Sequence, residues 1–188
     1  MKEQKFIIKN MTCNSCVELV TNELKALGIK KASVKLGEVK INDKKVNEIL
    51  IRKALQKHGF DIVNNYEEEM VENIRLSILE LVNGTVGIEK ELKFTLYIEK
   101  RLERTYKYLS KTFSKHRKVS IEKFFILAKI EKAKELIQYG ELTFSEIADN
   151  LGYTNTQHLS AQFKKMVGCT MTDFRDKRTK KRISMNKL

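Results

Sequence analysis

The chain has 188 residues, with 37 lysines and arginines against 24 aspartates and glutamates, which gives a formal net charge of +13. This excess of positive charge points to a polyanionic partner, with nucleic acid the most common and an anionic membrane surface the next. Hydrophobic residues make up 41% of the chain. That is enough for packed cores and excludes a wholly disordered protein.

The sequence also predicts where the protein works. No apolar run approaches the ~20 residues that a helix needs to cross a bilayer, so we expect no membrane partner. The apolar part of the opening MKEQKFIIKN is too short for a signal peptide. We therefore expect a cytoplasmic protein whose three cysteines stay reduced and serve as metal ligands or core residues.

Residues 1–65 are predicted to form a small α+β domain with the ferredoxin-like order βαββαβ. Short apolar or alternating runs predict its strands. Apolar side chains at helical spacing, such as Val17, Val20 and Leu24, predict its helices. The expected elements, in chain order, are strand 5–9, helix 17–28, strands 32–36 and 38–41, helix 45–59 and strand 60–63.

Cys13 and Cys16 lie three residues apart at the first strand-to-helix turn. A helix N-terminus stabilises thiolates, and two soft thiolates without oxygen or imidazole ligands favour Cu(I). Zinc prefers four ligands, and this turn offers two. A redox pair of the thioredoxin kind is an alternative, but that fold uses another strand order and a cis-proline, and this chain has no proline. A degenerate site is the third interpretation.

Residues 5–63 resemble a heavy-metal-associated domain, the module of copper chaperones and of copper-pump N-termini. The family signature Met-x-Cys-x-x-Cys is present as Met11, Cys13 and Cys16. The resemblance implies that the two cysteines bind Cu(I), with zinc or silver as other thiophilic ions, and that Met11 packs beneath the loop. The family's late loop corresponds to residues 58–60, where Phe60 is interpreted as packing and His58 stands one residue early for a ligand.

A polar, like-charged stretch interrupts the pattern after residue 63, and helical periodicity then continues almost to the end. We therefore expect a domain of residues 1–65, a linker of residues 66–70, an all-α domain of residues 71–178 and a basic tail of residues 179–188. The first helix of the all-α domain should bury Val71, Ile74 and Ile78. The tail is interpreted as a phosphate-binding arm or as a solvated segment.

The all-α domain contains an internal repeat. Adding fifty to six positions of the first copy gives a residue of the same or a similar kind in the second. The pairs are Leu109 and Leu159, Ser110 and Ser160, Phe113 and Phe163, Lys115 and Lys165, Ser120 and Thr170, and Phe124 and Phe174. Residues 121–139 between the copies predict one unbroken helix. Its length of roughly 28 Å compares with ~34 Å between successive major grooves.

Each copy predicts a helix, a tight turn and a second helix. In the second copy we expect Ser145 and Asn155 to cap the two helices, and Leu159, Phe163 and Met166 to form a buried stripe. Short polar side chains early in the second helix suit base edges in a major groove, and lysines suit phosphates. The candidate DNA contacts are Lys107, Ser110 and Lys111 in the first copy and Thr156, Gln157, Ser160, Lys164 and Lys165 in the second.

Residues 71–178 resemble the DNA-binding domain of the AraC/XylS family, which has two helix-turn-helix units joined by a long helix. The matching segments are residues 130–137, 146–148, 151–153, 163–165, 168–171 and 174–175. Met171 stands where the family usually has proline, Ala161 where arginine is common, and Glu103 where the first turn often has glycine. The resemblance implies double-stranded DNA as partner, and Cys169 is interpreted as a core side chain.

Three functional hypotheses remain open at this point. The first is a transcription regulator whose DNA binding responds to Cu(I) or a similar ion at Cys13 and Cys16. The second is a regulator whose N-terminal domain serves dimerisation or contact with a partner such as a metallochaperone. The third is a metal carrier that binds DNA incidentally. An enzyme is the least favoured class, because the sequence has no recognisable nucleophile–base set or phosphate loop.

Overall fold

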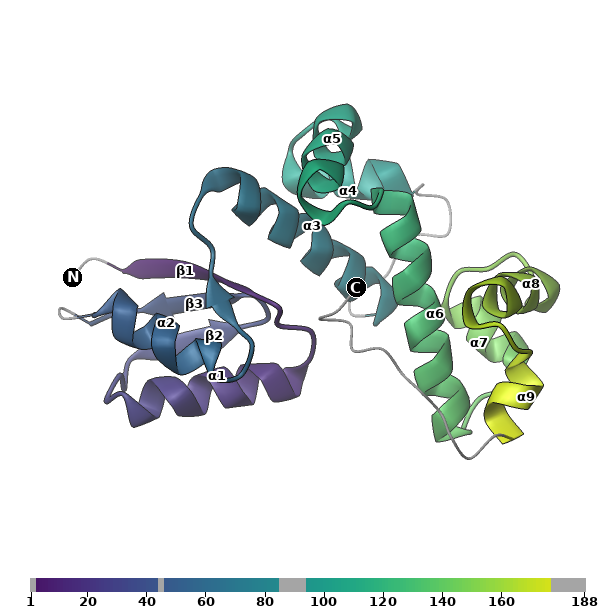
Figure 1. Cartoon of the computed structure of the whole chain (residues 1–188), viewed down its shortest axis with the longest axis horizontal. Helices are drawn as coiled ribbons and strands as arrows, with labels where there is room; N and C mark the ends of the chain where they lie inside the picture. Colours follow the sequence, from purple (N-terminus) through teal and green to yellow (C-terminus); the bar gives the residue numbers. More distant parts are fainter. Residues whose placement is uncertain (1–2, 44–45, 85–93, 177–188) are drawn as a thin grey trace. The chain divides into compact units, whose positions relative to one another are not determined.

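The computed structural model describes residues 3–43, 46–84 and 94–176. The chain forms two compact units, Met1–Leu76 and Ser77–Leu188 (Figure 1). Each unit has its own architecture and is described separately. The predicted basic tail, residues 179–188, lies outside the described residues.

The first unit is a small α+β structure with the predicted element order. Its elements are β1 (Gln4–Lys9), α1 (Asn14–Ala26), β2 (Ala32–Lys35), β3 (Glu38–Ile41), α2 (Glu48–Gln56) and β4 (Asp61–Ile62), followed by the first part of α3 (Tyr66–Val82). The strands form one sheet in the order β2-β3-β1-β4, and every neighbouring pair is antiparallel. Strand β1 therefore lies inside the sheet, and the thiolate turn follows directly from its end.

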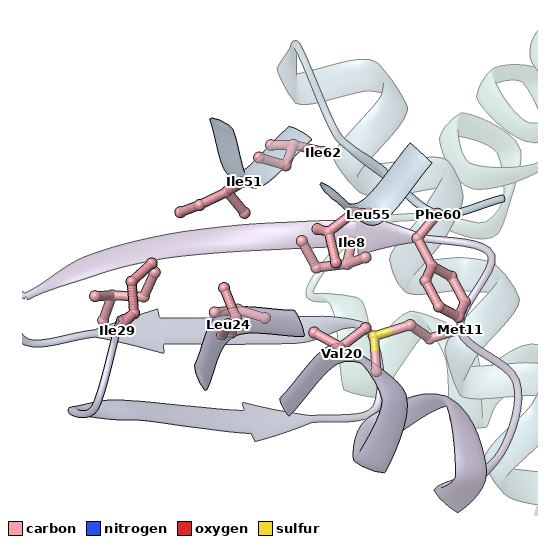
Figure 2. Packing of buried hydrophobic residues seen from close by; sticks show 11 residues of the cluster. Ile8, Met11, Val20, Leu24, Ile29, Ile51, Leu55, Phe60 and Ile62 are labelled. Atoms are coloured by element: carbon pink, nitrogen blue, oxygen red, sulfur yellow. The ribbon is translucent and has the colours of Figure 1, made fainter. Parts of the chain in front are cut away.

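The core of the first unit lies between this sheet and the helices α1 and α2. Ile8 of β1, Val20 of α1 and Leu55 of α2 are fully buried within it, and Figure 2 shows their side chains in this interior. Met11 is also fully buried, which agrees with its expected packing beneath the loop, and Phe60 belongs to the same cluster.

The predicted linker of residues 66–70 is wrong, because these residues form the first turn of α3. Asn65 accepts a 2.9 Å hydrogen bond from the backbone N–H of Glu68. Glu67, Glu68 and Glu69 occupy the first turn of the helix, where the helix dipole favours negative charge. A run of like charges that suggested a linker is thus a helix start. The boundary between the units falls after Leu76 rather than after residue 65.

The described part of the second unit is helical, as predicted. After the end of α3 it contains α4 (Phe94–Leu102), α5 (Tyr106–Arg117), α6 (Ile121–Tyr139), α7 (Phe144–Asn150), α8 (Thr156–Val167) and α9 (Met171–Asp176). Helix α6 has the predicted bounds because no breaker interrupts it, and Gly140 ends it in the left-handed conformation. It contacts α5, α7, α8 and α9 and so forms the central support of this unit.

The sequence repeat is also a structural repeat. Helices α5 and α8 each have 12 residues and lie fifty positions apart. Phe113 packs edge-on against Phe124 with ring centroids 5.4 Å apart, and Phe163 packs in the same way against Phe174 at 5.5 Å. Corresponding residues therefore make corresponding contacts in the two copies.

Two expectations for the second copy are wrong. Thr143, not Ser145, caps α7, and it forms a capping box with Glu146 in which each side chain bonds the backbone N–H of the other residue. Met166 is 36% exposed, so the buried stripe of α8 consists of Leu159 and Phe163. Met166 lies in the last turn of α8, where the helix extends beyond the surface that Leu159 and Phe163 pack against.

Candidate nucleic-acid interface and thiolate pair

Cys13 and Cys16 lie close together at the N-terminus of α1. Cys13 occupies the N-cap position with extended backbone geometry and is exposed, whereas Cys16, one turn into the helix, is half-buried. The two sulfurs are 3.4 Å apart, and the Thr12 Oγ1 atom lies 3.7 Å from the Cys16 sulfur. Burial favours the neutral thiol of Cys16, but hydrogen bonds with Thr12 and Cys13 outweigh it and hold the pKa of Cys16 below its ordinary value.

The donor set of this turn fits a thiophilic ion of low coordination number. Metal–sulfur bonds of about 2.3 Å, the length known for zinc, can reach one ion from two sulfurs at this separation. Among the residues that the structure describes, no group of three His, Cys, Asp or Glu side chains could hold a metal ion. His58 instead pairs with Glu23 at 2.9 Å. Four protein ligands, which structural zinc requires, are thus not gathered here.

None of the predicted DNA-contacting residues of helix α8 is buried. Asn155 caps the helix by accepting a 2.8 Å hydrogen bond from the backbone N–H of His158, as expected. Leu159 and Phe163 are fully buried and fix which face of the helix points inward. The remaining face carries exposed Gln157, Lys164 and Lys165 and half-buried Thr156 and Ser160. The structure therefore brings these five residues together on one helix.

Helix α5 repeats this arrangement in the first copy. Leu109 and Phe113 are fully buried, while Lys107 and Lys111 are exposed and Ser110 is half-buried. Thr105 occupies the N-cap position, but its side chain makes no capping hydrogen bond. The two helices thus differ in how their first turns are held, although their outer faces have the same polar and basic character.

Residues 98–177 match the family model described as a helix-turn-helix domain. This segment spans both copies of the repeat and α6. By this match, residues 98–177 are a helix-turn-helix domain.

Relatives of this chain include transcription regulators that also have a helix-turn-helix domain. The chain is 28% identical over 119 residues, 63% of its length, to the HTH-type transcriptional regulator YtdP of Bacillus subtilis. It is 30% identical over 84 residues, 44% of its length, to the HTH-type transcriptional regulator YdiP of Escherichia coli. The matched segments span 15% and 28% of those two proteins. The chain therefore corresponds to only a part of each relative.

A solved structure gives the same result for the fold. The chain is similar to the C-terminal domain of AraT, a response regulator from Geobacillus stearothermophilus, with 25% sequence identity and a TM-score of 0.51. This similarity covers 60% of the chain and 88% of the other structure.

Within the described residues, the helices are all too short or too polar to span a membrane.

Sequence reasoning missed one cluster in the helix-turn-helix domain. The amine of Lys129, on α6, lies 4.5 Å from the ring centroid of Phe125 and 4.8 Å from that of Tyr153. Tyr153, in the turn between α7 and α8, donates a 2.5 Å hydrogen bond from its hydroxyl to the Gln162 Oε1 atom. Burial lowers the pKa of Lys129 to about 8. Phe125 and Lys129 are four residues apart on one helix, and this spacing could have indicated their contact. The contact of Lys129 with Tyr153 depends on the tertiary fold.

Proposed function

We propose that this chain is a cytoplasmic transcription regulator that binds double-stranded DNA selectively, with α5 and α8 in successive major grooves. The observation that carries the proposal is the equivalence of α5 and α8. Both have the same length, the same buried apolar positions and an outer face of polar and basic residues. A helix fixed by its apolar face and polar on the other is suited to a major groove.

The side chains divide between two tasks. Thr156, Gln157 and Ser160 lie in the first part of α8 and are short enough to read base edges, with Ser110 at the corresponding position of α5. The lysines extend further and are expected to bind phosphates. These are Lys107 and Lys111 on α5 and Lys164 and Lys165 on α8. The net charge of +13 favours the approach to DNA.

We also infer that the first unit has the ferredoxin-like fold of heavy-metal-associated domains and binds Cu(I), or another thiophilic ion such as silver or zinc. Support comes from its element order, its sheet order β2-β3-β1-β4 and the two sulfurs 3.4 Å apart. In this proposal the ion modulates DNA binding, either through contact of the first unit with another part of the protein or through pairing of two copies. A metallochaperone is the proposed source of Cu(I).

The test uses a duplex that the wild-type chain selects from a randomised pool. Its affinity is measured with and without Cu(I), for the wild type and for the double variant Cys13→Ser/Cys16→Ser. Metal-dependent regulation predicts that Cu(I) changes only the wild-type affinity. Four equal affinities would leave a regulator whose first unit serves dimerisation or partner contact. Failure to select any duplex would favour a metal carrier.

A further inference from the structure

The geometry points to Lys129 as a positioning residue that sets the orientation of recognition helix α8 on the central helix α6. This inference rests on the proposed DNA-binding function, because it names a residue that would control one of its two contact helices. Lys129 need not touch DNA for this. Its amine lies between the rings of Phe125, on its own helix, and Tyr153, in the turn that leads into α8.

Tyr153 transmits the position of Lys129 to α8 through two contacts. Its hydroxyl bonds Gln162, in the middle of α8, and its ring packs edge-on against His158, in the first turn, with centroids 5.4 Å apart. These two α8 residues are four positions apart and lie on either side of Ser160, one of the side chains proposed to read bases. A shift of the Tyr153 ring would therefore rotate or tilt the recognition helix.

The same cluster extends toward the first helix-turn-helix unit. Phe125 stacks face to face on Phe94, at the start of α4, with ring centroids 4.1 Å apart and an interplanar angle of 1°. The sequence of contacts is thus Phe94, Phe125, Lys129, Tyr153 and α8. It connects α4, in the first helix-turn-helix copy, with the recognition helix α8 of the second copy. A cation between two ring faces is directional, because each ring attracts it along the normal to its plane.

The contacts of Lys129 favour a positioning role over a stabilising one. Within the described part of the chain, Lys129 forms no ion pair with a carboxylate. Its amine interacts there with the two aromatic rings. Burial without a counter-charge disfavours the ammonium form. A cation kept in such a place adds little net stability, whereas its two ring contacts restrict how the Tyr153 turn can sit.

The test compares Lys129→Met, which removes the charge at similar volume, with Lys129→Arg, which keeps a cation suited to stacking on rings. Lys123→Met is the matched control, because it removes one exposed positive charge from the same helix. The probe is the duplex selected by the wild-type chain. Lys129→Met should weaken binding about tenfold more than Lys123→Met, within the range of a desolvated cation–π contact. The melting temperature of Lys129→Met should not fall below that of the wild type. Lys129→Arg should retain most of the wild-type affinity for the duplex.

Phe125→Leu distinguishes positioning from direct DNA contact. If Lys129 acts through the rings, Phe125→Leu should weaken DNA binding about as much as Lys129→Met, although it removes no charge. The double variant should then bind DNA no less tightly than the single variant with the lower affinity. Equal binding by Lys129→Met and Lys123→Met would overturn the inference, as would multiplicative losses in the double variant.

A second measurement does not require DNA. In the nuclear magnetic resonance spectrum of the full chain, the ε-methylene protons of Lys129 should resonate upfield because they lie between two rings, and Phe125→Leu should reduce that shift. An unshifted resonance would overturn the inference even if DNA binding is confirmed. An upfield resonance in a chain that selects no duplex would support the geometry of Lys129 and contradict only the proposed function.

Discussion

The Nη2 atom of Arg75 donates a 2.6 Å hydrogen bond to the backbone carbonyl oxygen of Met11. Met11 immediately precedes the thiolate turn, and Arg75 lies on α3. The guanidinium is fully buried and forms three further hydrogen bonds to the Glu72 carboxylate. Its Nε atom donates to the two oxygens at 2.9 and 3.1 Å, and its Nη2 atom donates to Oε1 at 2.5 Å. The turn that carries Cys13 and Cys16 is therefore braced by a buried ion pair on α3, in residues that the sequence analysis had assigned to the all-α domain.

We expect Arg75→Met to destabilise the first unit strongly. The substitution leaves the Glu72 carboxylate buried without its cation, which typically costs about 3–5 kcal/mol of unfolding free energy. The measurement is urea unfolding followed by circular dichroism. In the control, Glu72→Gln/Arg75→Met, no charge remains buried, so the double variant should recover much of the loss. A double variant as unstable as Arg75→Met would show that the ion pair is not the cause.

Glycine at either of two positions in the first repeat copy should make the protein more stable. Glu103 and Lys118 have φ values of +51° and +57°, and the corresponding residues of the second copy are Gly152 and Gly168. The left-handed conformation costs a side-chain-bearing residue about 1–2 kcal/mol, which glycine avoids at the expense of greater unfolded-state entropy. We expect Glu103→Gly and Lys118→Gly each to raise the unfolding free energy by about 0.5–1 kcal/mol.

Thermal unfolding would check this expectation, with Gly168→Ala as the converse substitution. Apart from the two chain neighbours of Gly168, the described residues place no heavy atom within 4 Å of the position that its Cβ would occupy, so any loss of stability comes from the backbone. If Gly168→Ala does not lower the melting temperature, backbone strain does not explain the glycine pattern.

The stability of the second unit should depend on pH through Lys129. Burial lowers the pKa of Lys129 from the ordinary 10.5 to about 8. Between these pH values the unfolded chain binds more protons than the folded one, so the unfolding free energy should rise as the pH increases. The slope cannot exceed about 1.4 kcal/mol per pH unit for one proton. Because cysteines also titrate here, the relevant quantity is the difference in slope between wild type and Lys129→Met in urea unfolding. Identical slopes would contradict the shifted pKa.

Salt dependence should reveal which lysines lie on DNA. Each lost phosphate contact lowers the slope of log affinity against log salt concentration by about 0.9. We expect this change for Lys111→Ala on α5 and for Lys165→Ala on α8, both of which are exposed. Lys53→Ala, an exposed lysine on α2 in the other unit, is the control and should leave the slope unchanged. If Lys111→Ala alters neither slope nor affinity, the first helix-turn-helix unit does not contact DNA.

Several local errors of the sequence analysis had signals that could have corrected them. The pattern Thr143-x-x-Glu146 is the capping-box pattern, and it identifies Thr143 as the cap of α7 without any structure. Three glutamates after Asn65 are equally typical of a helix start. Both are short-range interactions, and both were overlooked because neighbouring residues offered a second plausible interpretation.

The sequence alone determined the element order of the first unit, the bounds of α6 and the twofold repetition of a helix pair. These features follow from periodicity, from breakers such as Gly140 and from local capping, all of which act between residues close in the chain. Only the tertiary structure decided that Arg75 braces the turn after Met11 and that Lys129 of α6 meets Tyr153 of the α7–α8 turn. These partners are separated by 64 residues in one case and by a helix and two turns in the other. The local sequence does not show that the side chains of Arg75 and Lys129 are withdrawn from solvent. Burial decides the difference, because a cation withdrawn from water is stable only where a carboxylate, a carbonyl or an aromatic face replaces its hydration.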